Sequence, residues 1–522
     1  EGLSLQKGIR VFASVLSAAI SGMEVRPVQV EADVSNGLPC FIMVGFPSAQ
    51  VKEAQDRVRT ALKNNGISLP PKKVTVNLAP ADLRKEGAGF DLPVAAAVLA
   101  ASGALEPKLL EGVMVVGELS LNGEVRSVSG VLPRVIHARE MGCRYCMIPF
   151  GNLEEGVLVQ GMKVIGVRHM KEVLEAVKDP EAFLKEHGLK ENCCTAGQEE
   201  AESVLDFADI CGQESARRAA EIAVSGFHNI LFIGPPGTGK TMLAKRIPTI
   251  MPSLTFEESL ELTKIYSIAG LLSPQRPLIR TRPFRSPHHT RSAASLTGGG
   301  RIPRPGEVTL AHRGVLFLDE MPEFSRRSLE VLRQPLEDKQ IQLSRTSGTY
   351  VFPAGFILAA AMNPCPCGYY PDMNKCRCTS GEVSHYLHRL SQPLLDRIDL
   401  CTEVPQVDFS QIAGKGGGES SAVIRKRVEK VRKIQQNRYK GEPISFNGEL
   451  SGRQLQKYCV LTKNALKVAQ NAFELMELSA RSYHRILKVS RTIADMEGEE
   501  LIHTRHLAEA LTYKAFDKKY KA

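Results

Sequence analysis

The segment from residue 229 to residue 247 constrains the fold of this chain more than any other part of it. It places the octapeptide GPPGTGKT, Gly234 to Thr241, between the apolar run 229–233 and the helical pattern 242–247. A glycine-rich turn between a buried strand and a helix start directs backbone N–H groups and the positive end of the helix dipole to one place. This order is typical of α/β folds that bind the phosphates of ATP.

Two residues of this loop have expected chemical roles. Lys240 is expected to reach the β and γ phosphates, and Thr241 can bind Mg²⁺ through its hydroxyl. ATP and Mg²⁺ are therefore the expected cofactors. The residues expected to contact ATP are Gly234, Pro235, Pro236, Gly237, Thr238, Gly239, Lys240, Thr241 and Met242.

Two further apolar runs end in polar residues that suit ATP hydrolysis. The run 314–318 ends in Asp319 and Glu320, and the run 356–362 ends in Asn363. We expect Asp319 to hold Mg²⁺, Glu320 to polarise the attacking water and Asn363 to orient that water or contact the γ-phosphate. The alternatives are a core strand followed by unrelated acids and, for Asn363 alone, a turn residue. Together with the loop, these residues predict an ATPase.

Composition restricts the remaining classes. The length of 522 residues suggests about three domains. The formal charge of +10 favours a polyanionic partner, although a basic surface without such a partner fits equally well. No apolar run reaches the length of a membrane-spanning helix, so we expect no membrane partner and a cytoplasmic protein. Twelve cysteines beside a nucleotide site suggest free or metal-bound thiols.

Changes of pattern along the chain predict an α/β fold with three domains. Short apolar strands alternate with helical patterns over 1–178, and a second α/β segment with the phosphate loop spans 206–405. The charged segment 179–205 reads as a linker. Glycines at 414–418 interrupt the chain, and an all-helical segment occupies 406–522. The expected strands of the first domain are 25–34, 40–44, 73–77 and 113–116, and its expected helices are 49–64 and 92–101.

Two close pairs of cysteines follow Asn363. They are Cys365 with Cys367 and Cys376 with Cys378. Four thiolates can form a closed tetrahedral Zn²⁺ site that holds together a loop with no core of its own. Because the pairs have one intervening residue rather than two, four reduced cysteines remain the alternative.

The phosphate-loop domain resembles the AAA+ ATPases, in particular their magnesium-chelatase and MCM-like branch. The resemblance implies that Arg397, in the segment 394–400, is an arginine finger that completes the site of a neighbouring subunit. An ion pair with Asp396 or Asp399 of the same chain is the alternative. The segment 479–485 resembles the sensor-2 helix, in which Arg481 or Arg485 would touch the phosphates.

Two insertions in this domain resemble parts that contact DNA. The segment 268–311 is similar to a helix-2 insert facing a central pore and contains Arg285, His288 and His289; an exposed loop is the alternative. The segment 339–348 resembles the pre-sensor hairpin of MCM helicases. That likeness implies DNA contacts by Lys339 and by Arg345 at the tip, whereas a solvated tip is the alternative.

The first domain resembles the proteolytic domain of Lon proteases in the segments 74–80, 84–93 and 116–123. Gly89 stands where those enzymes have the nucleophilic serine, and Leu132 stands where they have its lysine partner. Acyl transfer needs a hydroxyl or thiol and a base. The domain is therefore expected to be non-proteolytic, similar to the Lon-like domain of RadA branch-migration proteins. Its residues Lys52, Arg84 and Lys85 are candidate nucleic-acid contacts or an ordinary solvated face.

The full order of segments resembles the ComM/YifB family of magnesium-chelatase-like ATPases. The segments 77–82, 284–289 and 363–368 carry the match. The resemblance implies a homohexameric ring that uses ATP to act on DNA, as a helicase or branch-migration factor in recombination or natural transformation. The competing functions are a chelatase-type ATPase that remodels a protein partner, without a porphyrin substrate here, and an ATP-dependent protease. The missing serine and lysine argue against the protease.

Overall fold

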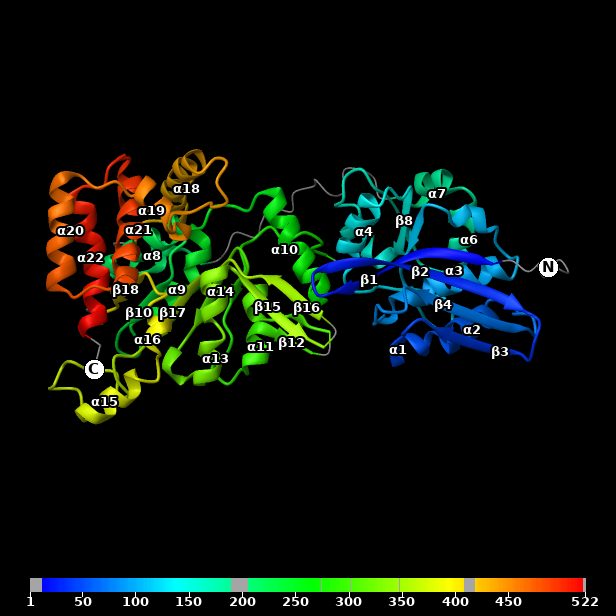
Figure 1. Ribbon diagram of the computed structural model, residues 1–522, viewed down its shortest axis with the longest axis horizontal. Coiled ribbons are helices and arrows are strands. Elements are labelled where there is room, and N and C mark those ends of the chain that lie inside the picture. Colours follow the sequence, from blue (N-terminus) through cyan, green and yellow to red (C-terminus); the bar gives the residue numbers. More distant parts are fainter. Residues whose placement is uncertain are drawn as a thin grey trace. The chain divides into compact units, whose positions relative to one another are not determined.

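The computed structural model describes residues 12–188, 205–273, 275–300, 302–346, 348–407 and 418–519. These residues form two compact units (Figure 1). Unit 1 combines the described residues up to 188 with Ser259–Ile279 and Ile302–Arg304, and unit 2 contains the other described residues from 205 onward. The division into three domains with boundaries at 178, 206 and 405 stays a prediction.

Unit 1 contains a seven-stranded mixed sheet. Strands β1, β2 and β4 pair antiparallel in the order β4-β2-β1, and the outer strands pair parallel. Helix α3 (Asp91–Ala101) packs on β1 and β2 and is buried along its whole length, as expected for a helix that is apolar on every side. In sheet order the strands are β3 (Cys40–Val44), β4 (Lys73–Ala79), β2 (Glu24–Ser35), β1 (Ala13–Ser21), β5 (Val113–Val115), β8 (Tyr145–Pro149) and β9 (Lys163–Val167).

The strands expected from 25, 40, 73 and 113 are confirmed, and three further strands complete the sheet. The other elements of unit 1 are α1 (Ala49–Lys52), α2 (Ala54–Asn64), η1 (Ala88–Phe90), η2 (Pro107–Leu110), β6 (Glu118–Leu119), β7 (Val125–Arg126), α4 (Val131–Glu140), η3 (Phe150–Asn152), α5 (Leu153–Gly156), α6 (Met170–Lys178) and α7 (Pro180–His187). Helix α10 (Phe256–Ala269) begins in unit 2 and continues into unit 1.

Helix α7 corrects the expected linker. Asp179 caps this helix by accepting the N–H of Ala182, and Phe183 is buried in the core of unit 1. The buried ring of Phe183 therefore attaches this charged segment to unit 1. The helix is too short for its apolar residues to show a recognisable helical period in the sequence. The rest of the expected linker, 189–204, lies outside the described residues.

Unit 2 contains a five-stranded, fully parallel sheet. Its three central strands are buried at every residue, as is usual for parallel sheets covered on both faces. The expected second α/β segment is therefore confirmed. In sheet order the strands are β11 (Phe284–Arg285), β14 (Val315–Leu318), β17 (Ile357–Met362), β10 (Ile230–Ile233) and β18 (Leu400–Glu403).

The described residues from 418 to 519 are helical, as expected, and their helices share one core with the parallel sheet. Ile424, Val489 and Leu507 belong to the same apolar cluster as Phe232 and Ile357 of the sheet. These helices are α18 (Ser421–Arg438), α19 (Arg453–Tyr458), α20 (Lys463–Leu475), α21 (Ala480–Glu497) and α22 (Thr504–Lys519), with the short η7 (Asn447–Glu449).

The remaining elements belong to unit 2 or span both units. They are η5 (Phe207–Asp209), α8 (Glu214–Gly226), α9 (Lys240–Ile250), α11 (Ala293–Thr297), β12 (Gly298–Gly299), β13 (Arg304–Pro305), α12 (Glu307–Leu310), η6 (Met321–Glu323), α13 (Arg326–Glu330), α14 (Arg333–Asp338), β15 (Gln340–Arg345), β16 (Gly348–Pro353), α15 (Ser380–Leu387) and α16 (Gln392–Leu395).

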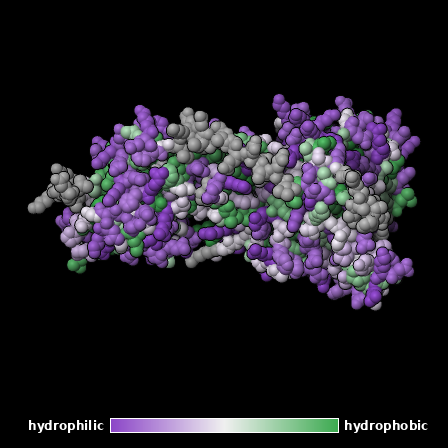
Figure 2. All heavy atoms as spheres, turned by 180° about the vertical axis from the view of Figure 1, so that it is seen from behind, coloured by the Kyte–Doolittle hydropathy of each residue, from purple (hydrophilic) through white to green (hydrophobic). Residues whose placement is uncertain are grey.

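The face of the molecule in Figure 2 is mostly polar. Hydrophilic residues cover most of that face of each unit, and hydrophobic residues are scattered among them. In the part of the chain that the structure describes, no helix combines the length and apolarity needed to cross a membrane.

Candidate active site

The loop from Gly234 to Gly239 joins the buried strand β10 to helix α9. Gly237 and Gly239 have φ angles of 78° and 87°, in the left-handed region that only glycine adopts without strain. A Cβ atom on Gly234 would lie 2.2 Å from the carbonyl oxygen of Val404, so the strand can approach β18 only without a side chain here. The glycines of the motif thus have the positions that a phosphate-binding loop requires.

Lys240 lies at the first position of α9 and is largely buried. Its Nζ donates to the carbonyl oxygens of Gly234 and Pro235, both at 2.7 Å, and to Oδ1 of Asn363 at 3.1 Å. Burial lowers the pKa of Lys240, while the carboxylates of Asp319 and Glu320 act in the opposite direction. All three acceptors are neutral, so phosphate oxygens can replace them with a gain in charge complementarity.

The two residues expected to bind Mg²⁺ are in direct contact. Thr241 donates from Oγ1 to Oδ2 of Asp319 at 2.7 Å. The other carboxylate oxygen, Oδ1, accepts the N–H of Glu320 at 3.0 Å. A hydroxyl and a carboxylate at the phosphate loop are the hard oxygen ligands that Mg²⁺ favours.

Glu320 follows β14 in a left-handed conformation, with φ 50° and ψ 49°. A residue with a side chain held in that region is strained, and such strain concentrates at functional sites. Glu320 and Asn363 come from the neighbouring strands β14 and β17 and both line a cavity of about 410 Å³ at the phosphate loop. The lining residues are Pro236, Gly237, Thr238, Gly239, Lys240, Thr241, Met242, Asp319, Glu320, Met362 and Asn363.

Arg397 lies between α16 and β18, and its ion-pair partner is neither Asp396 nor Asp399, the two same-chain partners expected. Its guanidinium is 2.5 Å from Oε1 of Glu337 and donates to the carbonyl oxygen of Pro393 at 2.5 Å. Within the described residues, its ion-pair partner is thus Glu337 rather than Asp396 or Asp399. The Glu337 side chain is 52% exposed, whereas the Arg397 side chain is 11% exposed, so only the acidic partner of the pair lies at the surface.

Arg485 is buried on α21 and contacts the segment that carries Arg397. It donates to the carbonyl oxygens of Leu395 at 3.2 Å and Ile398 at 2.7 Å, and it pairs with Asp396 at 3.2 Å. The donors of Arg485 are thus directed at this segment of the chain, and its role as a phosphate contact stays a prediction. Arg481 is exposed in the first turn of α21, and its role as a phosphate contact stays a prediction.

Asn229, at the start of the strand that leads into the phosphate loop, holds the same segment from the other side. Its side-chain amide donates to the carbonyl oxygen of Arg397 at 2.8 Å, and its backbone N–H donates to Asp399 at 3.1 Å. Burial would raise the pKa of Asp399, but the neighbouring His228, with Nδ1 3.6 Å from Oδ2, holds it at about 2. The sequence did not predict this role of Asn229. The only indication in the sequence is a polar residue directly before an apolar strand.

The predicted hairpin is present, and Arg345 lies at its tip. Strands β15 and β16 pair antiparallel, with Arg345 opposite Gly348. The Arg345 side chain is exposed, and it donates to the carbonyl oxygens of Ser344 at 3.1 Å and Gly300 at 3.5 Å. Both acceptors are neutral, so neither contact balances its charge.

The other candidate DNA contacts are more constrained. Lys339 lies at the base of the hairpin, with its ammonium 5.7 Å from the centre of the Phe227 ring, and burial lowers its pKa. Arg285 belongs to the edge strand β11 and binds both carboxylate oxygens of Glu307, at 2.7 and 3.0 Å. The structure therefore does not favour these two as contacts to an external phosphate. The rings of His288 and His289 lie 4.1 Å apart, and His288 is exposed.

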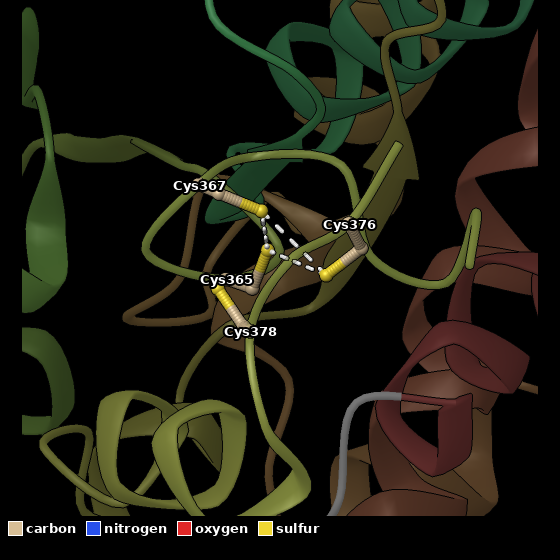
Figure 3. Close-up of side chains that lie close together, drawn as sticks. All are labelled: Cys365, Cys367, Cys376 and Cys378. Carbon is tan, nitrogen blue, oxygen red and sulfur yellow. Dashed lines mark hydrogen bonds between the residues drawn. The ribbon is translucent and has the colours of Figure 1, made fainter. Parts of the chain in front are cut away.

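The sulfur atoms of the four cysteines converge, as Figure 3 shows. All four sulfur atoms lie within 4.8 Å of one another. The sulfur of Cys365 is 3.4 Å from that of Cys367 and 3.8 Å from that of Cys376, and the sulfurs of Cys367 and Cys376 are 3.5 Å apart. Four sulfurs around Zn²⁺ at about 2.3 Å would be about 3.8 Å apart, so these side chains fit that ion. Burial opposes ionisation of Cys367, but N–H donors from Tyr369 and Arg377 and the neighbouring thiols lower its pKa to about 6.

In unit 1 the two positions expected to correspond to the Lon nucleophile and base are Gly89 and Leu132, and neither side chain is reactive. Gly89 lies in η1, where a Cβ would be 3.5 Å from Val116, and Leu132 is buried in α4. Lys85 is fully buried, donates to the carbonyl oxygens of Gly45 at 2.9 Å and of Pro80, and has a pKa lowered to about 8 by burial. Lys85 therefore belongs to the core rather than to a solvated or nucleic-acid-binding face.

Comparison with protein families gives three matches along the chain. The description "Magnesium chelatase, subunit ChlI" matches residues 206–412. "Subunit ChlI of Mg-chelatase" matches residues 30–152, and "Magnesium chelatase, subunit ChlI C-terminal" matches residues 418–514. Together the three matches cover most of both units.

Relatives match over nearly the full length. The protein YifB of Salmonella typhimurium is 44% identical over 509 residues, 97% of this chain and 97% of its own length. The competence protein ComM of Haemophilus influenzae is 44% identical over 96% of this chain and 97% of its own length. Shorter stretches are similar to Lon protease 2 of Bacillus subtilis, 30% over 26% of each chain, and to its DNA repair protein RadA, 41% over 11% and 13%.

Proposed function

The chain belongs to the ComM/YifB family of magnesium-chelatase-like AAA+ ATPases, and from that premise we propose that it is an ATP-driven ring motor acting on DNA. The observation that carries the proposal is the convergence of Lys240, Thr241, Asp319, Glu320 and Asn363 on one cavity. These residues supply a phosphate cradle, two magnesium ligands, a group to polarise water and an amide to orient it. Mg²⁺ bound there would neutralise charge on the phosphates.

The proposed ring is a homohexamer with its ATPase sites at the seams between subunits. Arg397 supplies the residue that such a site needs from the neighbouring subunit. In the single chain its guanidinium pairs with Glu337, whose side chain is 52% exposed, while the Arg397 side chain itself is 11% exposed. A γ-phosphate of the neighbour carries more negative charge than the Glu337 carboxylate, so in the proposed ring it can displace Glu337 from the guanidinium.

DNA is the proposed substrate of the motor, with helicase or branch-migration activity in recombination or natural transformation. Arg345 at the hairpin tip is exposed and donates to two neutral carbonyl oxygens, which leaves its charge available to a phosphate. Repeated around a ring, such a residue would neutralise one phosphate per subunit. The net charge of +10 and the names of two relatives, competence protein ComM and DNA repair protein RadA, support the same partner.

We expect single-stranded and forked DNA to stimulate ATP hydrolysis, with stimulation falling as salt increases. Arg345→Ala should weaken DNA binding and reduce the slope of log affinity against log salt by about one for each phosphate that is no longer neutralised. The measurement is ATPase rate and DNA affinity across a salt series. The matched control is Arg505→Ala, because Arg505 is an exposed arginine of α22 that pairs with Glu497 and Glu499. Absence of stimulation at every salt concentration would rule out a DNA motor.

A second candidate is an ATPase that remodels a protein partner, as the three matches to a magnesium-chelatase subunit suggest. It predicts ATP hydrolysis that DNA does not change. An ATP-dependent protease is not favoured, because Gly89 and Leu132 stand at the positions of the Lon nucleophile and base and provide neither a hydroxyl nor an amine.

We also propose that the four cysteines hold one structural Zn²⁺ ion. Their sulfurs are arranged for tetrahedral coordination, and residues 371–375 of the loop between the pairs are all exposed, so the loop lacks a core. Elemental analysis should find about one zinc per chain in the wild type. Cys378→Ser should lose most of that zinc, whereas Cys143→Ser, in unit 1, should keep it. A wild-type protein purified without chelators that contains no zinc would refute the site.

A further inference from the structure

We infer that the four-cysteine centre sets the affinity of the protein for ATP, by bracing the phosphate loop through Gly368. This inference rests on the proposed zinc site. It goes beyond that site because it assigns the centre a regulatory effect on nucleotide binding rather than the stability of its own loop alone.

The first link is a backbone contact between the cysteine loop and the phosphate loop. A Cβ atom built on Gly368 would lie 2.4 Å from Cδ of Pro236, so the bare backbone of Gly368 packs on that proline. Pro236 lines the cavity at the phosphate loop. Gly368 has a φ of 87° and is buried, so both its conformation and its surroundings require glycine.

The second link joins Gly368 to the sulfur atoms. The N–H of Gly368 donates to Sγ of Cys365 at 3.2 Å, and the N–H of Tyr370 donates to the same sulfur at 3.3 Å. Cys365 is buried, whereas the other three cysteines are partly exposed. The N–H of Gly368 also donates to the carbonyl oxygen of Cys365 at 3.0 Å, so the backbone and the sulfur of Cys365 together position Gly368 against Pro236.

The third link runs through the chain itself. Asn363, whose Oδ1 accepts from Nζ of Lys240 at 3.1 Å, stands two residues before Cys365. A centre that fixes Cys365 thus restrains two walls of the cavity, the proline of the phosphate loop and the amide at the end of β17. Both walls lie where the phosphates of ATP are expected.

Zinc binding and ATP binding should consequently be coupled. With free thiols, the loop is held by backbone hydrogen bonds, such as Gly368 N–H to the carbonyl oxygen of Cys365 at 3.0 Å, and by weak sulfur contacts. Four sulfurs fixed on an ion would restrict the positions of Gly368 and Asn363 further. When the metal orders the loop, ATP binding loses less conformational entropy in ordering the cavity. The two sites are then positively coupled. Because binding coupling is reciprocal, ATP should in turn raise the affinity of the centre for zinc, so that a competing chelator removes less zinc at equilibrium.

The test compares two glycine variants in the full chain with wild type. Gly368→Ala disrupts the close packing on Pro236 and leaves all four cysteines in place. Gly381→Ala is the matched control, because a Cβ there meets no atom within 4 Å. Affinity for a fluorescent ATP analogue is measured for each protein with zinc, after chelation and after zinc is returned, and zinc content is measured in parallel.

We expect chelation to weaken binding of the analogue by the wild type by about tenfold, and returned zinc to restore it. Gly368→Ala should keep one zinc, bind the analogue with the weakened affinity and respond little to chelation, while Gly381→Ala should behave as wild type. If chelation leaves the affinity of a zinc-loaded wild type for the analogue unchanged, this inference is overturned but the proposed metal site is not. The wild-type measurements test the inference even if Gly368→Ala does not fold. A wild type without zinc overturns both this inference and the proposed metal site.

Discussion

Replacing Arg397 with alanine is expected to lower ATP turnover by about a thousandfold or more while leaving ATP affinity nearly unchanged. An arginine supplied by a neighbouring subunit acts on charge that develops at the γ-phosphate in the transition state, so its loss affects turnover rather than binding. The measurement is turnover at saturating ATP together with the dissociation constant of a fluorescent ATP analogue.

Glu337→Gln is the informative control for Arg397. In the single chain Arg397 pairs with Glu337 at 2.5 Å, and local structure could depend on that pair. If the pair were the whole role of Arg397, the two variants would have the same defect. We expect Glu337→Gln to retain turnover near the wild-type rate, because an amide leaves the guanidinium able to act in the neighbouring site. Equal loss in both variants would contradict the trans role.

Glu320→Gln should reduce turnover by about a hundredfold to ten-thousandfold with ATP binding retained. The amide has the shape of the carboxylate but cannot accept the proton of the attacking water. The left-handed backbone conformation of Glu320, with φ 50°, lies at the end of β14 and should be the same in the variant. The rate of phosphate release under saturating ATP and Mg²⁺ measures the effect.

Glu323→Gln provides the matched comparison for Glu320. Glu323 lies in η6, three residues farther along, and pairs with Arg389 at 2.9 Å outside the residues that line the phosphate cavity. It should hydrolyse ATP at close to the wild-type rate. A Glu320→Gln protein that keeps full turnover would mean that another group activates the water.

The parts of the site that the sequence predicts are those fixed by local backbone geometry. A phosphate loop needs glycines at left-handed positions, and Gly237 and Gly239 occupy them. An acid pair directly after an apolar strand must emerge at the carboxyl edge of a parallel sheet, where Asp319 meets Thr241. Convergent cysteine pairs likewise follow from their spacing, and the four sulfurs lie within 4.8 Å of one another.

What the sequence could not predict depends on contacts between distant segments. Arg485 and Arg481 lie one helical turn apart, and only tertiary packing shows that Arg485 is buried against the carbonyl oxygens around Arg397. Lys339 and Lys85 look like surface charges in the sequence. The structure places the first against the Phe227 ring and the second in the core, because a long side chain can bury its stem while its ammonium contacts a ring face or a carbonyl oxygen.

The most direct test of the central claim, that ATP is hydrolysed at sites shared by two subunits, is a mixing experiment. Arg397→Ala retains Lys240, and Lys240→Ala retains Arg397, so each variant should be inactive alone. In equal mixtures about a quarter of the seams would combine an intact phosphate loop with an intact arginine, if subunits assemble head to tail at random. We therefore predict recovery of up to about a quarter of wild-type turnover per subunit in the mixture. Mixed rings that form but remain as inactive as the separate variants would contradict the account.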